Sequence, residues 1–455
     1  MSETLRKAWL VYVCLLPFNL FYFLGIQHIY PVDLVFPVVL VLSAAVVYRR
    51  LSVVLRQDLP VLAYLGIFLV IASAAVLRSG FSGSLATAVA AQVMLVALYL
   101  LFRCGVAERL SLARLLTVWA AASTAACLVG LGAVALGICG VGTPLARWYP
   151  NLGPGAWRLI GTVGHSPNNA YGYFHLGFFI SLGLWLGKRD EAGPGGIFLS
   201  RRVLLAAVLV HAAALLLTFS RGLTGLLLGL IVAAPALAGK RHLRHLLPVK
   251  ITLWAVLILL FAYSAVFFTY TTDALFTPSR QAADSLRLDK EREHLRVYSY
   301  KNVLHLDEQA RYRRLACGFT WLPSMHGYLL EASLHVFLGH WALGVGPGRF
   351  PEVLARLRDS GELGLPPGLP ALRPHSTFMG ALAEGGLAGF AGLAVLFWFL
   401  LGPRSRRRLT EDPLGTCLYA CLAGYLLFGL NVDVMNFRWL WLLMAAAAAW
   451  SKPDV

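Results

Sequence analysis

The stretch Pro374-His375-Ser376-Thr377-Phe378-Met379-Gly380 places a histidine directly before an apolar run that continues to Leu401. A long polar segment, from about Asp273 to Arg373, precedes it. If the run crosses a bilayer, His375 lies at the water-facing mouth of a helix. There its imidazole titrates near neutral pH and can accept a proton from a hydroxyl group. The alternative is a histidine that only caps or anchors the helix.

The composition is that of a membrane protein. Of the 455 residues, 58% are hydrophobic and 13% are charged, and the mean hydropathy is +0.69. A soluble domain has about 25% charged residues. We therefore predict an all-α polytopic membrane protein with one sizeable segment outside the bilayer.

Apolar runs of about 20 residues, long enough to cross a bilayer, recur along the chain. We predict twelve, near residues 8–26, 33–48, 59–77, 85–102, 112–138, 168–187, 203–219, 222–239, 247–270, 376–402, 412–430 and 434–450. The interruption at Ser220-Arg221-Gly222 is interpreted as a tight turn between two helices. The predicted organisation is helices one to nine in residues 1–270, a loop domain with short helices in 271–375, and helices ten to twelve in 376–455.

The distribution of basic residues predicts the orientation of these helices. With the N-terminus in the cytoplasm, the cytoplasmic connections contain just over half of the 39 Lys and Arg residues, as the positive-inside rule requires. Both termini are then cytoplasmic and the long loop is external. The short connections on the external side contain Arg78, Arg147, Arg158, Arg221 and Arg438. Most of the basic excess faces anionic headgroups of the cytoplasmic leaflet, which argues against nucleic acid as a partner.

The external segment contains parts with different patterns. Residues 279–314 are rich in charge with leucines at helical spacing, which predicts one or two amphipathic helices. Tyr328 to Leu343 is apolar and about one helix long, and we expect it to lie at, or dip into, the outer surface. It breaks at Gly344-Val345-Gly346-Pro347-Gly348. Pro366 to Pro374 forms a stiff, proline-rich lead into His375.

Arg221 is the second candidate functional residue. It is the one charged residue between positions 203 and 239, and the predicted topology places it at the outer face. A guanidinium at that depth requires a compensating anion or carbonyl groups, and it can bind phosphate through two hydrogen bonds. The alternative is an arginine that only extends towards water at a helix turn. The basic loop makes the outer mouth cationic, which suits an anionic, lipid-linked substrate.

Other polar residues have less specific roles. Asn168, within Gly161 to Asn169 (GTVGHSPNN), is a candidate polar contact at the same mouth, and His165 is a weaker one. His211 is expected to be a buried, hydrogen-bonded histidine. Glu384 is expected to be a structural carboxyl rather than the partner of His375.

A metal site is not predicted. His326, Glu331, His335 and His340 lie near one another in the sequence, but no set of four ligands has the spacing that zinc sites show.

The segment around His375 resembles the catalytic pattern of the O-antigen ligase family, membrane glycosyltransferases that join undecaprenyl-pyrophosphate-linked polysaccharide to lipid A–core. In that pattern His is followed by Asn, Ser or Gln, then nine residues, Gly, two residues, and Gly, Thr or Tyr. Here these positions are His375, Ser376, Gly386 and Gly389. Leu343 to Phe350 resembles the family's glycine-rich turn, Ser220-Arg221-Gly222 its first essential arginine, and Gly161 to Asn169 its Gly-Thr-x-x-x-x-Pro-Asn segment.

The resemblance implies a GT-C-like fold in the bacterial inner membrane, with a large periplasmic loop between helices nine and ten. It also implies transfer that needs no metal, ATP or other cofactor. The implied partners are the lipid-linked donor, the lipid A–core acceptor and membrane lipids. His375 would be the general base on an acceptor sugar hydroxyl, Arg221 would bind the departing pyrophosphate, and Ser376 and Asn168 would contact substrate.

One position departs from the family pattern. The family's second arginine aligns with His326, so either His326 replaces it or Arg313, Arg314 or Arg349 supplies the second phosphate contact. An O-antigen or exopolysaccharide polymerase, which uses the same donor, is the nearest alternative function, and a ligase with a protein hydroxyl as acceptor is another. A transporter is less consistent with the sequence, since it would place ionisable groups at the membrane midplane.

Overall fold

The computed structural model describes residues 3–18, 31–105, 109–148, 157–164, 166–187, 199–218, 220, 222–238, 305–306, 315–316, 325–363, 365 and 371–451, and most of them are helical. The helices are α1 (Glu3–Leu15), α2 (Pro31–Gln57), α3 (Leu59–Ser79), α4 (Gly83–Gly105), α5 (Arg109–Ile138), α6 (Pro167–Gly187), α7 (Arg201–Leu217), α8 (Leu223–Ala238), α12 (Met325–Gly339), α13 (Phe350–Ser360), α14 (Thr377–Leu401), α15 (Pro403–Leu409), α16 (Pro413–Phe428) and α17 (Arg438–Ser451). Two antiparallel hairpins pair β1 (Ala146–Trp148) with β2 (Trp157–Leu159) and β3 (His305–Leu306) with β4 (Leu315–Ala316).

Several of these helices have the length and hydropathy of membrane spans. In the described ranges, four segments qualify: α3, α4, Leu112–Ile138 of α5, and Thr377–Leu409, which joins α14 and α15. The two halves of α2 meet at 87° and add a fifth span if they are counted as one. The chain is therefore a helical protein with several helices able to cross a membrane.

The predicted number of twelve spans is not established by these helices. The runs predicted at 59–77, 85–102, 112–138 and 376–402 coincide with the four qualifying segments. The runs at 203–219, 222–239, 412–430 and 434–450 form α7, α8, α16 and α17, which have only 14 to 17 residues. A perpendicular crossing requires about 20 residues. The run at 247–270 lies outside the described residues.

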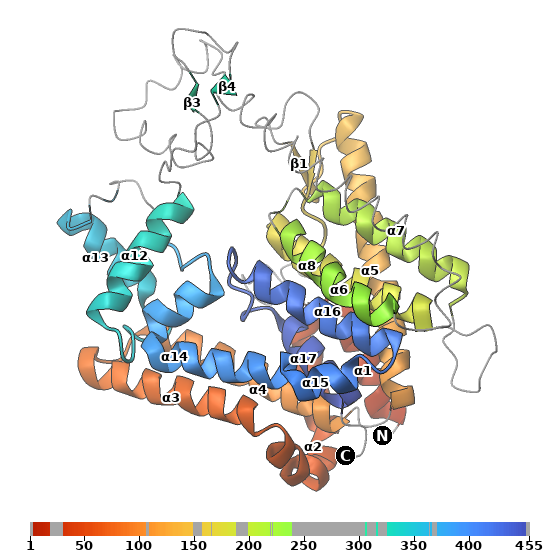
Figure 1. Ribbon diagram of the computed structural model, residues 1–455, viewed down its shortest axis with the longest axis horizontal. Coiled ribbons are helices and arrows are strands. Elements are labelled where there is room, and N and C mark those ends of the chain that lie inside the picture. Colours follow the sequence, from red (N-terminus) through yellow and green to blue (C-terminus); the bar gives the residue numbers. More distant parts are fainter. Residues whose placement is uncertain are drawn as a thin grey trace.

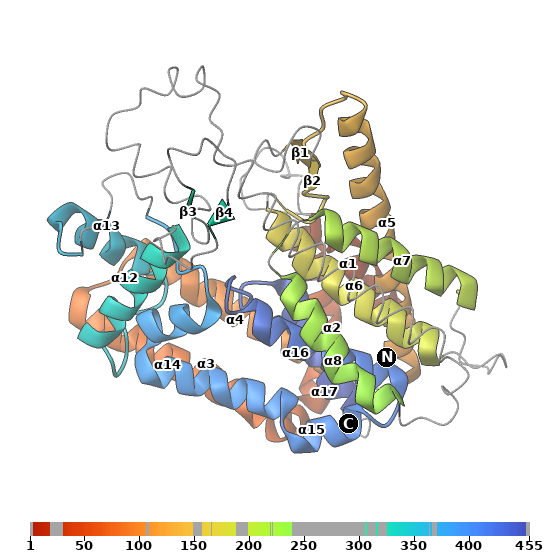
Figure 2. The same cartoon turned by 45° about the horizontal axis from the view of Figure 1, so that its top comes forward.

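The helices form two groups that α17 joins. In one group α14 packs along α3, and α3 along α4. In the other, α16 packs on α6 and α8, and α6 on α7. α17 contacts both α4 and α16. Figures 1 and 2 show α12 and α13 near one end of α14, where α14 breaks, and α15 at the opposite end.

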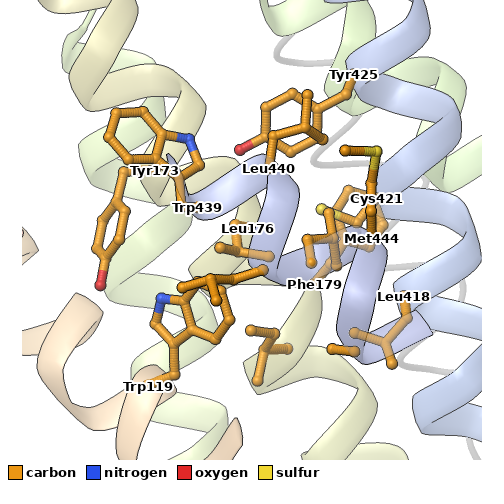
Figure 3. Close-up of a cluster of buried hydrophobic side chains, with 14 of the residues drawn as sticks. Trp119, Tyr173, Leu176, Phe179, Leu418, Cys421, Tyr425, Trp439, Leu440 and Met444 are labelled. Atoms are coloured by element: carbon orange, nitrogen blue, oxygen red, sulfur yellow. The ribbon is translucent and has the colours of Figure 1, made fainter. Parts of the chain in front are cut away.

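A core rich in aromatic side chains surrounds α17. Figure 3 shows Trp119 of α5, Tyr173 of α6 and Trp439 of α17 in one cluster with Leu418, Cys421 and Tyr425 of α16. The rings of Tyr173 and Trp439 meet edge to face, with centroids 5.6 Å apart. From Trp439 to Ser451 every residue of α17 is buried. A helix that is apolar on all sides belongs in an interior, which explains the central position of α17.

A buried ion pair fixes the corner between α2 and α3. Arg103 Nε of α4 donates to Asp58 Oδ2 at 3.1 Å, and both side chains are inaccessible to solvent. Tyr99 Oη donates to the same carboxylate oxygen at 3.0 Å, and Arg103 Nη2 donates to Gln57 Oε1 at 3.0 Å. Buried charges are tolerated when they are paired in this way.

The polar segment before α14 differs in part from its prediction. α12 confirms the apolar helix predicted near 328–343, and the glycine break follows it. Within the range predicted as helical, 279–314, the described residues 305–306 form strand β3, so the helix prediction is wrong there; the rest of that range lies outside the described residues. The sequence pattern also does not predict α13, which is amphipathic and buries Phe350, Leu354 and Leu357.

Candidate functional site

His375 lies in the extended segment that leads into α14. Pro374 before it and Ser376 after it are buried, and His375 itself is half-buried. Burial lowers the pKa of the His375 imidazole below its ordinary value of 6.5, because the charged form loses hydration. At neutral pH the imidazole is therefore mostly in its proton-accepting form.

Ser376 fixes the start of α14. Its hydroxyl accepts a hydrogen bond from Met379 N at 3.4 Å, as an N-cap residue does. The same hydroxyl donates to Gly429 O at 3.2 Å, and Thr377 N donates to that carbonyl at 2.8 Å. Ser376, expected as a substrate contact, is thus placed as a cap that holds His375 in position.

α14 breaks one third of the way along, at Gly386, where φ is 61° and ψ is −158°. This backbone region is essentially restricted to glycine. The glycine-rich turn after α12 packs against the break, and a Cβ at Gly386 would overlap the backbone of Ala342. Four hydrogen bonds join turn and helix: Val345 N to Ala383 O (3.0 Å), Gly346 N to Glu384 O (2.9 Å), Leu387 N to Trp341 O (2.7 Å) and Ala388 N to Ala342 O (3.1 Å).

Glu384 attaches the same turn to α14 through its side chain. Its two carboxyl oxygens accept from Gly348 N at 2.9 Å and from Phe350 N at 3.3 Å. A carboxylate is favourable at the N-terminus of a helix, here α13, because the helix dipole is positive at that end. Glu384 is therefore the structural carboxyl that the sequence indicates.

Two arginines attach the glycine-rich turn to the connection between α3 and α4. Arg349 is 6% exposed, and its Nη2 donates to Gly80 O. Arg78 Nη2 donates to Gly344 O at 2.7 Å. Arg349, a candidate for the second phosphate contact, thus supports the turn through Nη2, while its buried Nε has no partner among the described residues; its contact with substrate stays a prediction.

A second polar pair lies where α6 begins. Ser220 Oγ donates to Asn168 Oδ1 at 2.9 Å, so Ser220, which precedes α8 in the chain, lies against the start of α6. Tyr171, one helical turn further along α6, packs on Phe428 with ring centroids 4.8 Å apart. Phe428 precedes Gly429, whose carbonyl binds the start of α14. The end of α16 thus connects the Asn168–Ser220 pair to the segment that contains His375.

Several expected site residues lie outside the described residues. These are Arg221, Arg313, Arg314 and His165. His326 falls in the first turn of α12, but its side chain is not among those described. The contacts of these groups with substrate stay predictions.

A cavity of about 110 Å³ is lined by Arg373, Pro374 and Thr377 of the segment that contains His375, though not by His375 itself. Its walls are formed by α3, α4, α14, the glycine-rich turn and the loop before α17. Its polar lining residues are Tyr64, Gln92, Arg373, Thr377, Glu384, Asp433 and Asn436. Sequence reasoning does not assemble this set, because its members come from distant parts of the chain. The sequence contains two signals that could have pointed to this set: Arg373, two positions before His375, and Gln92, an amide inside the apolar run of α4.

Two other histidines in the described ranges have structural partners. His211 is fully buried between Ala207 O, at 2.7 Å from Nδ1, and Ser123 Oγ, at 2.9 Å from Nε2, as expected. His335 Nε2 lies 3.1 Å from Glu362 Oε1 in an exposed pair. In the part of the chain that the structure describes, no three His, Cys, Asp or Glu residues are grouped to bind a metal ion.

No protein-family model matches this chain, and no curated protein is significantly similar to it. A function must therefore be inferred from the residues around His375 and from the motifs they form.

Proposed function

We propose that this chain is a membrane glycosyltransferase of the O-antigen ligase type. It transfers polysaccharide from undecaprenyl pyrophosphate to a sugar hydroxyl of lipid A–core, at the periplasmic face of the bacterial inner membrane. The observation that carries the proposal is His375 itself, a half-buried imidazole with a lowered pKa, in the segment whose Pro374 and Thr377 line a cavity. An imidazole that is mostly neutral at pH 7 can act as a general base.

The proposed reaction is a single displacement. His375 takes the proton of the acceptor hydroxyl as that oxygen attacks the anomeric carbon of the donor sugar. The bond between the anomeric carbon and the pyrophosphate oxygen breaks, the configuration inverts, and undecaprenyl pyrophosphate leaves with the electron pair. The imidazolium then releases its proton to water.

Arg221 stabilises the negative charge that develops on the departing pyrophosphate. The hydrogen bond between Asn168 and Ser220 supports this role, because it holds the residue before Arg221 against the start of α6. We propose that His326, Arg313, Arg314 or Arg349 supplies a second cation.

The position of the basic helix α15 supports a periplasmic location for the break in α14. Arg404, Arg406, Arg407 and Arg408 lie in α15, which follows α14 directly, and short basic segments stay in the cytoplasm. If the part of α14 after Gly386 crosses the inner membrane, the break is on the periplasmic side. Residues 377–385 then return along it, since Phe378 packs on both Phe390 and Phe397.

The test is His375→Ala in a strain that lacks the chromosomal gene, with lipopolysaccharide analysed on silver-stained gels and lipid-linked polymer by blotting. Loss of capped core together with accumulation of long undecaprenyl-linked polymer is the expected result. Retention of only single-repeat species would favour the polymerase instead. Normal capped core in the variant would refute the role of His375. His340→Ala, an exposed histidine outside the cavity, is the matched control and should ligate normally, provided both variants insert equally.

A further inference from the structure

The cavity lined by Pro374 and Thr377 also contains a buried side-chain donor without a partner among the described residues. Gln92 of α4 lines it, is 6% exposed, and its Nε2 has no hydrogen-bond partner among the described residues. The residue lies about 13 Å from the start of α4, inside an otherwise apolar span. A buried amide without a partner is costly, and a ligand with hydroxyl groups would supply the missing acceptor.

The charges around the cavity argue against an anionic ligand. Arg373 is the one cationic lining residue, and it interacts electrostatically with both Glu384 and Asp433. Asn436 Nδ2 also donates to Asp433. The carboxyl groups therefore balance the arginine, whereas a pyrophosphate would need uncompensated positive charge. A neutral ligand that both donates and accepts hydrogen bonds suits this lining.

The remaining wall is apolar and partly aromatic. Tyr64 and Phe68 of α3 are one turn apart, with ring centroids 6.5 Å apart, and Ile67 and Ile71 lie beside them. Small-molecule sites typically combine such a wall with a few polar groups that fix orientation. A sugar ring, with C–H groups on its faces and hydroxyls at its edge, matches this combination, and the volume is sufficient for several water molecules or one such ring.

We infer that this cavity binds the acceptor, as a neutral sugar ring whose hydroxyls contact Gln92, Tyr64 and Asn436. The inference rests on the proposed function and adds to it the direction from which the acceptor approaches His375. The acceptor reaches His375 between α3, α4 and α14, while the donor pyrophosphate lies on the other side, near Asn168 and Ser220 at α6 and α8. The start of α14 and the end of α16 separate the two sides, so His375 meets the acceptor hydroxyl at their boundary.

The experiment measures the two Michaelis constants separately, with purified protein in nanodiscs, undecaprenyl-pyrophosphate glycan and lipid A–core. In Gln92→Leu the KM for lipid A–core should rise about tenfold, as for the loss of a buried hydrogen bond, while the KM for the donor stays unchanged. Asn436→Ala, at an exposed position, should also raise the KM for lipid A–core, and it replaces Gln92→Leu in the test if that variant folds poorly. Thr87→Ala, on the exposed face of α4, is the matched control.

A binding measurement separates this inference from the proposed function. Lipid-free core oligosaccharide is titrated into the donor-free protein by calorimetry, and its affinity should fall about tenfold in Gln92→Leu. If His375→Ala abolishes transfer but both cavity variants keep wild-type acceptor KM and affinity, the inference fails alone. A raised donor KM in Gln92→Leu would overturn it as well, by assigning the cavity to the donor. If His375→Ala transfers normally, the proposed function fails whatever the cavity binds.

Discussion

Replacing Gly386 with alanine is expected to separate the glycine-rich turn from α14. The native φ of 61° and ψ of −158° cost a residue with a Cβ about 1–3 kcal/mol. The added Cβ also overlaps the Ala342 backbone, so the hydrogen bonds from Leu387 N and Ala388 N are lost, at about 0.5–1.5 kcal/mol each. Together these terms give a loss of roughly 4 kcal/mol in the free energy of unfolding.

Thermal unfolding in detergent measures this loss. A chain of this length has an unfolding entropy on the order of 1 kcal/mol/K, so the Tm should fall by roughly 4 °C. Ligation should fall too, because the break positions the helix that begins at His375. Gly66→Ala is the matched control, since Gly66 has ordinary helical geometry and space for a Cβ, and its Tm should stay the same or rise. If the Tm of Gly386→Ala equals that of Gly66→Ala and the variant ligates normally, the described break in α14 and its attachment to the turn are refuted.

Further variants test the base, its cap and the buried ion pair. Burial lowers the pKa of His375 from 6.5, so the neutral base persists to lower pH than a free imidazole does. The acid limb of the pH profile of kcat/KM should therefore lie below pH 6.5. A limb above that value contradicts the assignment of His375 as the general base. Ser376→Ala should cost about 1 kcal/mol of stability through loss of the cap and leave both KM values unchanged, with Ser376→Asn restoring the Tm; a raised KM at unchanged Tm would instead make Ser376 a substrate contact. Arg103→Met leaves Asp58 buried without its cation and should cost about 3–5 kcal/mol, seen as loss of the folded peak in size-exclusion chromatography. The double variant Arg103→Met/Asp58→Leu should recover part of that peak. If nothing is recovered, the unpaired Asp58 carboxylate is not the cause of the instability.

The fold was predictable where the apolar pattern alone decides it. The runs at 59–77 and 85–102 match α3 and α4 closely, because membrane spans are specified by length and hydropathy. α13 was missed since its pattern is short and flanked by glycine and proline. Strand β3 was missed because alternating charge in residues 279–314 also fits a surface helix. α17 is apolar like a span but has only 14 residues, and its burial depends on neighbours that the pattern does not reveal.

The sequence identified His375 as a candidate site residue, but it did not identify the residues that line the cavity or the hydrogen-bond partners of the predicted site residues. The histidine before an apolar run indicates a group at the start of a helix, and the structure places His375 just before α14, in a segment that contributes Pro374 and Thr377 to a cavity. The expected substrate contacts of Ser376 and Arg349 stay predictions; the structure adds a hydrogen bond from each to a backbone carbonyl. Hydrogen-bond partners of this kind depend on tertiary packing. For the same reason Gln92 was not selected, since a lone amide in an apolar run carries no spacing that identifies its partner.

The spacing between His375 and Gly386 has a structural explanation that is independent of chemistry. The helical residues from Thr377 to Gly385 span ~13 Å, which is the distance from the capped mouth of α14 to its break. Glu384 must reach Gly348 and Phe350 at one end of this segment, while Ser376 must reach Gly429 at the other. One added residue would rotate these ends by ~100° relative to each other. The pattern thus combines one titratable side chain, His375, with a fixed number of helical residues and with a backbone conformation at Gly386 that only glycine adopts readily. Such constraints allow most surrounding apolar residues to vary, so a resemblance confined to these few positions is compatible with the absence of wider sequence similarity.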